Sequence, residues 1–373
     1  MREPNRSSLA GGVRAWYSES KPHLVSWEVP PTSDMVRGGD ALVEQARQQG
    51  FRVPPPSKVA VPIIDVHTHA FPDRPTHELV EAARAYGVER LVALASLEQS
   101  VEVRGQFPEL VLPGPMLDYT HWQDADRFAA DNVAIVREAA RAGAPLIKLW
   151  FAPRFHDRIP MKLDDPRLDP VFEEIERQGL AVLVHVSDPD IWFAKYYTDT
   201  ARYGTKADQY PPLEHRLERH PGIVFISAHM GGDPEHLDHL AELMDRYPNY
   251  HVDTSATKWI VRELGRKPAE ARDFFQAYAD RILFGTDQVV FRAEDAEPHR
   301  YHVRYWVHRV FWETDIRAHS PIPDSDAEGE PELNGLDLPA PVLEKVYWAN
   351  AVRLLRLGLP QEQGQNAQTG TGP

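Results

Sequence analysis

The segment VPIIDVHTH, residues 61–69, decides how the rest of the sequence is interpreted. It begins with β-branched apolar residues, which favour a buried β-strand. Side chains alternate between the two faces of a strand, so we expect His67 and His69 to point the same way. Two imidazoles at the end of one strand can bind a divalent metal such as zinc, iron, nickel or copper. Taken alone, however, a His-x-His pair is more often two polar loop residues, so the rest of the chain must distinguish the two interpretations.

Short apolar segments alternate with helical patterns along the following part of the chain. Alternation of strands and helices predicts parallel strands joined by crossover helices. Eight such units are what a (β/α)8 TIM-type barrel requires. The competing fold, a doubly wound open sheet, should carry a glycine-rich phosphate loop after an early strand, and the sequence has none. The predicted strands are 61–66, 90–95, 110–116, 145–150, 180–185, 223–229, 250–255 and 281–287, and the predicted helices are 76–86, 124–142, 169–178, 212–219, 235–246 and 269–278.

We expect three regions in the chain. Residues 59–359 form the barrel. Residues 1–58 form a partly irregular N-terminal arm with a short helix at 40–48, and residues 360–373 are of low complexity and form a disordered tail.

Two insertions interrupt the barrel. The first, 188–210, is rich in aromatic residues, and the second, 291–338, contains a helix at 301–313 followed by an acidic loop rich in Pro and Gly. A closing helix is predicted at 341–357. Loops that follow strands lie at the C-terminal face of a barrel, so we expect the first insertion and part of the second to cover its mouth.

Charge and composition narrow the class of protein. The 373 residues include 41 Lys and Arg against 56 Asp and Glu, which gives a formal net charge of −15. This charge argues against binding to nucleic acid or to anionic membranes, both of which need a basic surface. No segment has the apolar length of a membrane span or the apolar core of a signal peptide. Cysteine is absent, which excludes disulfides and thiolate metal sites. We therefore expect a cytoplasmic protein.

Polar residues with metal-binding side chains fall at the ends of several predicted strands. The C-terminal strand ends of a barrel meet at one rim, where barrel enzymes carry their chemistry. The sequence therefore predicts a metal site at this rim. The residues concerned are His67 and His69 on the first strand, Lys148 on the fourth, His185 on the fifth, His229 on the sixth and Asp287 on the eighth.

Each of these residues has a simpler interpretation when it is considered alone. His185 or His229 could be a hydrogen-bonded core histidine, and Asp287 could cap the following segment. Lys148 has three alternatives of equal weight: an ion-pair partner, a cation that binds the substrate, or a carboxylated lysine that bridges two metals.

The motifs taken in order resemble the amidohydrolase superfamily. The match is closest to the amidohydrolase-related branch that includes aminocarboxymuconate semialdehyde decarboxylase, and it covers about residues 59–359. The motifs are Asp65-Val-His67-Thr-His69, Val184-His185, Ala228-His229-Met-Gly-Gly, Leu-Phe-Gly-Thr-Asp287 and Tyr347-Trp-Ala-Asn350-Ala.

This resemblance implies a metal-dependent enzyme on a barrel. It implies one divalent metal ion, zinc or alternatively manganese, held by His67, His69, His185 and Asp287. His229 would then act beside the metal-bound water, as a catalytic acid or base. In binuclear relatives the lysine of the fourth strand is carboxylated, so a second metal with a carboxylated Lys148 stays open.

The resemblance, with which the chemistry of these residues is consistent, leaves three functions open. The first is hydrolysis of a C–O or C–N bond in a small carboxylate-bearing substrate by a metal-activated water, with His229 or Asp287 taking the proton. The second is a non-oxidative decarboxylase, a carboxy-lyase acting on an aromatic or muconate-type acid. The third is a catalytically dead barrel that only binds.

Substrate contacts and assembly are predicted more broadly. Lys148, Arg154 and Arg262 are cations near strand ends that could hold a carboxylate, and Trp150 could line an apolar pocket. The aromatic residues of the first insertion and the N-terminal arm favour a homodimer.

Overall fold

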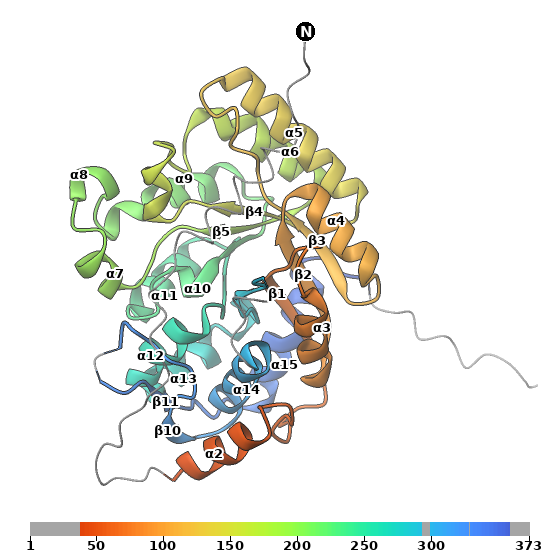
Figure 1. Ribbon diagram of the computed structural model, residues 1–373. Coiled ribbons are helices and arrows are strands. Elements are labelled where there is room, and N and C mark those ends of the chain that lie inside the picture. Colours follow the sequence, from red (N-terminus) through yellow and green to blue (C-terminus); the bar gives the residue numbers. More distant parts are fainter. Residues whose placement is uncertain (1–37, 293–298, 328, 359–373) are drawn as a thin grey trace, which may run out of the picture.

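The computed structural model describes residues 38–292, 299–327 and 329–358, and within them the chain forms a barrel of parallel strands surrounded by helices (Figure 1). Most strands are short and buried along their whole length, as expected when helices cover a sheet. The strands are β1 Ile63–His69, β2 Val88–Ala95, β3 Val111–Pro115, β4 Leu146–Trp150, β5 Ala181–His185, β6 Phe225–Ser227, β7 Tyr250–Asp253, β8 Ile282–Leu283 and β9 Gln288–Val289.

The strand pairings close into a ring. One sheet has the order β3-β2-β1-β9 and the other β4-β5-β6-β7-β8, and every pair in both is parallel. A parallel bridge between Met116 and Lys148 joins β3 to β4. On the other side, the Val66 amide donates to the Phe284 carbonyl over 3.0 Å, which joins β1 to the end of β8. The predicted (β/α)8 barrel is confirmed.

The eighth strand differs from its prediction as one segment, 281–287. The structure divides it into β8 and β9, with four residues between them. Asp287 lies at this turn with φ +54°, a conformation that is uncommon outside glycine. The turn brings the Asp287 amide to the His67 carbonyl at 2.7 Å.

Helices cover the outside of the barrel, and most follow the predicted positions. The helix α5 shows why: the Asp124 side chain accepts from the Arg127 amide at its start, and Phe128 and Val136 lie buried on one face. The outer helices are α3 Thr76–Ala85, α4 Leu97–Gln106, α5 Ala125–Arg141, α6 Asp169–Gln178, α9 Pro211–Arg219, α11 Leu237–Arg246, α12 Thr257–Arg266 and α13 Pro268–Ala277.

Two of these helices, α4 and α12, are absent from the sequence-based prediction. In α4 only Ser100 and Val103 are buried, so its apolar pattern is weak, although the Ser96 hydroxyl caps it by accepting from the Gln99 amide. In α12 the apolar spacing of Ile260 and Leu264 is helical. The Ser-x-x-Gln start of α4 and the apolar spacing in α12 are the sequence features that could have predicted these two helices.

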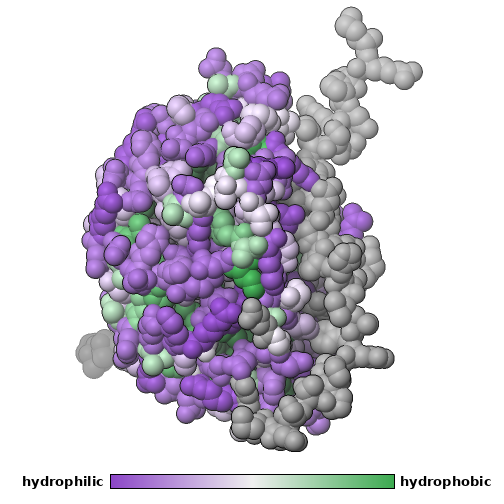
Figure 2. All heavy atoms as spheres, turned by 90° about the vertical axis from the view of Figure 1, so that its left-hand side faces the viewer, coloured by the Kyte–Doolittle hydropathy of each residue, from purple (hydrophilic) through white to green (hydrophobic). Residues whose placement is uncertain are grey.

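The two insertions contact each other. The first contains α7 Asp190–Lys195 and α8 Thr200–Tyr203, and the second contains α14 Arg300–Glu313 and the antiparallel pair β10 Arg317–His319 and β11 Glu332–Asn334. The Asp326 carboxylate accepts from the Trp192 indole at 2.9 Å and from the Tyr196 hydroxyl at 3.1 Å. The face that carries α7 and α8 is mostly hydrophilic, with apolar side chains gathered in a few hollows (Figure 2).

Both ends of the described chain pack against the barrel. The predicted helix at 40–48 is α2 Asp40–Gln48, and its Asp40 carboxylate accepts from the His319 amide at 2.7 Å. The closing helix, predicted as continuous, is divided into α15 Ala340–Glu344, a π-helical turn Lys345–Ala349 and α16 Asn350–Leu354. The predicted disordered tail, 360–373, and most of the predicted arm lie outside the described residues. Across the described chain, no helix has the length and apolarity needed to span a membrane.

We predict that the hydrogen bonds of Asn350 are the main polar contacts between the closing helix and the barrel. Its buried amide donates to the Ala279 carbonyl at 2.7 Å and to the Ile282 carbonyl at 2.8 Å. Asn350→Leu leaves both carbonyls without this donor, so we expect the free energy of unfolding to fall by about 2–5 kcal/mol. Denaturant unfolding measures it. Gln106→Leu, which changes an exposed amide at the end of α4, is the control and should cost less than about 1 kcal/mol. Equal losses in both variants would contradict the assignment.

Candidate active site

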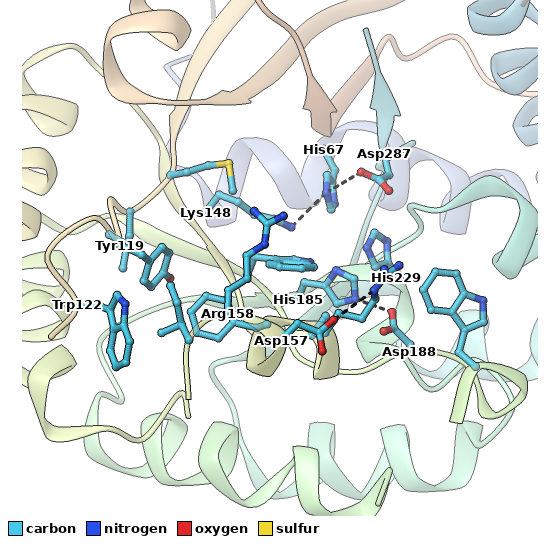
Figure 3. A pocket seen from close by; sticks show the side chains of 18 of the residues that line it. His67, Tyr119, Trp122, Lys148, Asp157, Arg158, His185, Asp188, His229 and Asp287 are labelled. Atoms are coloured by element: carbon cyan, nitrogen blue, oxygen red, sulfur yellow. Dashed lines mark hydrogen bonds and ion pairs between the residues drawn. The ribbon is translucent and has the colours of Figure 1, made fainter. Parts of the chain in front are cut away.

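A cavity of about 770 Å³ opens at the C-terminal ends of the strands, and Figure 3 shows the side chains that line it. Its floor carries His67, Lys148 and Asp287. Its walls include aromatic side chains from the loops and from the first insertion, among them Trp150, Trp192, Tyr197 and Trp259. This agrees with the expectation that the first insertion covers the mouth of the barrel.

His67, His69 and Asp287 converge at the floor. The Asp287 Oδ1 atom lies 3.3 Å from His67 Nε2 and 3.2 Å from His69 Nε2. Each residue offers one ligand atom, and these atoms lie within 4.8 Å of one another. Both histidines are buried, whereas the Asp287 side chain is 25% exposed toward the cavity. The group therefore combines two imidazoles and one carboxylate around one point.

The local backbone explains this convergence. His67 and His69 are two positions apart on β1 and so share a face, with ring centroids 5.5 Å apart. Gly285 permits the close approach of the eighth strand, because a Cβ atom there would lie 3.0 Å from the His67 Cβ. The hydrogen bond from the Asp287 amide to the His67 carbonyl then fixes the carboxylate beside the rings.

Asp65 stabilises the turn between β8 and β9 that carries Asp287. Its buried carboxylate accepts from the Thr286 hydroxyl at 2.7 Å, the Thr286 amide at 3.1 Å and the Tyr305 hydroxyl at 2.9 Å. Burial raises the pKa of Asp65 to about 7, although the hydrogen bond from Thr286 opposes the shift. Asp65 was noted in the sequence only as part of a motif, and its supporting role comes from the structure.

Asp253 at the end of β7 is a site residue that the sequence analysis missed. Its Oδ2 atom lies 2.8 Å from His67 Nδ1, and the carboxylate is fully buried. Burial alone would raise the pKa of Asp253, but the His67 ring outweighs this effect and holds the pKa below its usual range. A carboxylate on the far nitrogen orients a metal-binding histidine and fixes its tautomer. The available signal was its place at a strand end, the criterion used for the other residues.

His229 lies against His67. Their ring centroids are 5.1 Å apart, and the Nδ1 atom of His229 lies 2.7 Å from the Ser255 hydroxyl. The backbone at His229 and Met230 has positive φ, 58° and 53°, a strained conformation that often marks functional sites. Burial, followed by the charge of His185, holds the pKa of His229 well below its ordinary value. Both effects favour the neutral form of the ring.

His185 lies beside this group without being part of it. Its ring centroid is 4.6 Å from that of His229, but its Nε2 atom faces the Asp188 carboxylate at 2.9 Å. The Tyr197 hydroxyl donates to the other oxygen of Asp188 at 2.6 Å. The structure thus brings three of the four predicted metal ligands together, and places the fourth in a hydrogen-bonded chain that leads to the first insertion.

Of the predicted substrate contacts, three line the cavity and one does not. Lys148 lies 3.2 Å from His67 Nε2, and burial lowers its pKa to about 8. Trp150 and Arg154 belong to the cavity wall. Arg262 lies outside the cavity lining, where it pairs with Glu263 and with Asp324 of the second insertion. The prediction failed for Arg262 because two buried carboxylates already neutralise its guanidinium.

The residues present fit a divalent metal. Burial lowers the pKa of His69 to about 4, so its imidazole is neutral and can act as a ligand. Burial and Lys148 disfavour a proton on His67, yet the Asp253 and Asp287 carboxylates outweigh them and raise its pKa. The carboxylates around His67 therefore stabilise positive charge at this ring. Imidazole and carboxylate are donors that zinc accepts.

Fold and site together define a barrel protein with a His/Asp centre suited to a metal ion. The amidohydrolase family model matches residues 64–357, and the chain belongs to that family. No curated protein matches the sequence at a significant level.

Three solved structures can be set beside the chain. An uncharacterised TIM-barrel protein from Bordetella bronchiseptica is 18% identical, with 79% of this chain and 99% of that one covered and a TM-score of 0.49. The 5-carboxyvanillate decarboxylase of Sphingomonas paucimobilis is 15% identical, with 80% and 100% covered and a TM-score of 0.49. A candidate 2-pyrone-4,6-dicarboxylic acid hydrolase from Pseudomonas putida is 16% identical, with 80% and 98% covered and a TM-score of 0.49.

We predict that the protein binds one zinc ion per chain and that His67→Ala abolishes this binding. Removing the imidazole deletes a ligand at the centre of the group. Elemental analysis after equilibration with zinc measures the content. His319→Ala, which changes a histidine paired with Asp40 far along the chain, is the control and should retain the metal.

The same measurement on His229→Asn decides how many metals bind. We expect this variant to keep its zinc in the His67, His69 and Asp287 group, because His229 belongs to a different candidate group, with His67 and Asp253, and its Nδ1 atom faces Ser255. Loss of one of two ions would instead indicate a binuclear site with a carboxylated Lys148.

Proposed function

We propose that this protein is a metal-dependent hydrolase that cleaves a C–O or C–N bond in a small carboxylate-bearing substrate. The observation that carries the proposal is the convergence of His67, His69 and Asp287, two of which line the cavity, with the His229 ring beside His67. A zinc ion, with manganese as the alternative, would be held by these three residues. Whether His185 joins them depends on its release from Asp188.

The metal would supply a Lewis acid and lower the pKa of a bound water toward neutrality. The residues of the chain do the rest. His229 accepts a proton from the water and later returns it to the leaving oxygen or nitrogen, as a general base and then a general acid. Asp287 is engaged with both histidines of β1, so we assign the proton transfer to His229 in preference to Asp287.

The cavity supports a small acid as the substrate. The Lys148 ammonium lies at the floor and the Arg154 guanidinium lines the wall, and both can bind a carboxylate. Arg158, which the sequence analysis did not name, lines the same cavity. Apolar contact comes from the indoles of Trp150 and Trp259, whose ring centroids lie 6.3 and 6.4 Å from that of His185.

A second candidate function is non-oxidative decarboxylation of an aromatic acid. The observation that favours it is the pair of indoles beside the histidines, since Trp259 lies edge-on to His229 at 5.4 Å and could pack against a planar ring. In this reaction His229 would have to deliver a proton to the ring carbon that loses CO2. The two functions therefore differ in which product is released and in the first proton transfer.

We predict hydrolysis without CO2 release. The zinc- or manganese-loaded protein is assayed against carboxylate-bearing lactones, esters and anilides and against hydroxybenzoates, with acid release and CO2 measured in parallel. His229→Asn should lower the turnover of any hydrolysed substrate by about 10²–10⁴-fold while keeping the metal. CO2 release without hydrolysis would replace the proposal with the decarboxylase. If the protein neither binds metal nor turns over any substrate, the remaining hypothesis is the catalytically dead barrel that only binds.

The role of Lys148 in substrate binding has its own test. Lys148→Met keeps the length of the side chain but removes its charge, so we expect KM for the carboxylate-bearing substrate to rise at least tenfold. Arg266→Met, at an exposed arginine outside the cavity, is the control and should leave KM unchanged. An unchanged KM in Lys148→Met would indicate that Arg154 or Arg158, and not Lys148, binds the carboxylate of the substrate.

A further inference from the structure

Ser255 lies between the two stacked histidines of the site. It follows β7, is fully buried, and its hydroxyl oxygen is 2.7 Å from His229 Nδ1 and 3.0 Å from His67 Nδ1. The same hydroxyl lies within hydrogen-bond reach of Asp253 Oδ1. The Ser255 hydroxyl therefore contacts both imidazoles and the Asp253 carboxylate.

The hydrogen positions follow from what each group can donate. A serine hydroxyl has one proton to give and lone pairs with which to accept, whereas a carboxylate can only accept. Asp253 accepts from two backbone amides and faces His67 Nδ1, so the Ser255 hydroxyl donates to Asp253 and its oxygen accepts from a ring N–H. The closer ring is His229, which must then carry its proton on Nδ1.

The other contacts of Asp253 show that it reaches the His229 ring only through Ser255. The Oδ1 atom accepts from the backbone amides of His229 and Ser255 at 2.8 and 3.0 Å, and the Oδ2 atom is occupied by His67 Nδ1. No contact that the structure gives joins Asp253 to the ring of His229. His67 is thus oriented by Asp253 directly, while the His229 ring is oriented through Ser255.

We propose that Ser255 is a positioning residue that holds His229 as the Nδ1–H tautomer, with the Nε2 lone pair on the ring edge away from Ser255 and available to the cavity. The inference rests on the proposed function, because it concerns the residue to which that function assigns the proton transfer. In the neutral ring, this tautomer leaves Nε2 as the proton acceptor. A proton acceptor at this position suits the hydrolysis proposed above, in which the ring takes a proton first.

The proton balance is complete within the residues named. An O–H bond of water breaks, its proton forms the Nε2–H bond of His229, and the water oxygen bonds to the substrate carbon. The resulting imidazolium donates through Nδ1–H to Ser255, whose own proton remains directed at the negative Asp253. The Nε2 proton then moves to the leaving oxygen or nitrogen as the C–O or C–N bond breaks, and His229 is neutral again.

The test is ¹⁵N NMR of the histidine ring nitrogens in the metal-free, full-length protein, at a pH where the ring is neutral. His229→Asn assigns the signals of His229. In the wild type we expect a protonated Nδ1 and an unprotonated Nε2. A wild-type ring with its proton on Nε2 would overturn the proposal, and this result needs no variant to fold.

Variants separate a positioning role from a merely structural one. In Ser255→Ala we expect the His229 signals to become those of a tautomer mixture, while the signals of His67, which keeps Asp253, stay unchanged. Ser255→Thr, which retains the hydroxyl, should restore the wild-type His229 signals. Ser100→Ala removes a buried hydroxyl from α4 that donates only to the Leu97 carbonyl, and as the control it should change neither ring. An unchanged His229 tautomer in Ser255→Ala would overturn the proposal.

Zinc affinity gives a second, independent readout. Competition with a chromophoric chelator should show the same zinc affinity in Ser255→Ala as in the wild type. Asp253→Asn, which removes the partner of His67, should bind zinc about 10–100-fold more weakly. If Ser255→Ala loses zinc as strongly as Asp253→Asn, then Ser255 acts on His67 and the proposal fails. None of these measurements uses a substrate, so a failure of the proposed hydrolysis would leave them standing and would be recognised separately.

Discussion

The buried carboxylate of Asp253 is the constraint on which the site depends. A buried charge is tolerated only when it is fully hydrogen-bonded, and Asp253 meets this condition with donors from three elements. His67 belongs to β1, the His229 amide follows β6, and Ser255 follows Asp253 itself. Satisfying one carboxylate therefore fixes the relative positions of three strand ends. The barrel makes this arrangement available, because parallel strands in a closed ring end at a common rim.

A second buried carboxylate, Asp65, connects the insertion after the eighth strand to the site. Tyr305 of α14 donates to Asp65, and Asp65 in turn binds Thr286, the residue before Asp287. The helix α14 is buried along most of its length, which is unusual for the outer helix of a barrel. Its burial is consistent with this connection, because the helix must pack closely against the barrel to bring a hydroxyl to the underside of the turn that presents Asp287 to the histidines.

The sequence was informative where one periodicity or one strand end determined the outcome. Alternating apolar segments predicted the closed barrel, and strand ends located four residues that line one cavity, His67, His185, His229 and Asp287, with His69 buried beside Asp287. The sequence was silent where the outcome depended on pairing between distant segments. Arg262 resembled a free cation until the structure placed Asp324, 62 residues away, against it. The partner of His185 could not be read either, because the loop conformation decides that Asp188 turns back onto the ring.

Carboxylates of the second insertion hold part of the cavity wall in place. The second insertion contributes Asp324 and Asp326, and these carboxylates neutralise Arg262 and hold Trp192 by its indole nitrogen. Trp192 packs edge-on against Trp259 at 4.8 Å, so the two insertions and α12 make one continuous aromatic wall. A wall held by buried ion pairs and hydrogen bonds cannot adapt cheaply to a larger ligand, since opening it would strand those carboxylates. Lys148 takes no part in these pairs: it lines the cavity, and its Nζ atom lies 3.2 Å from His67 Nε2.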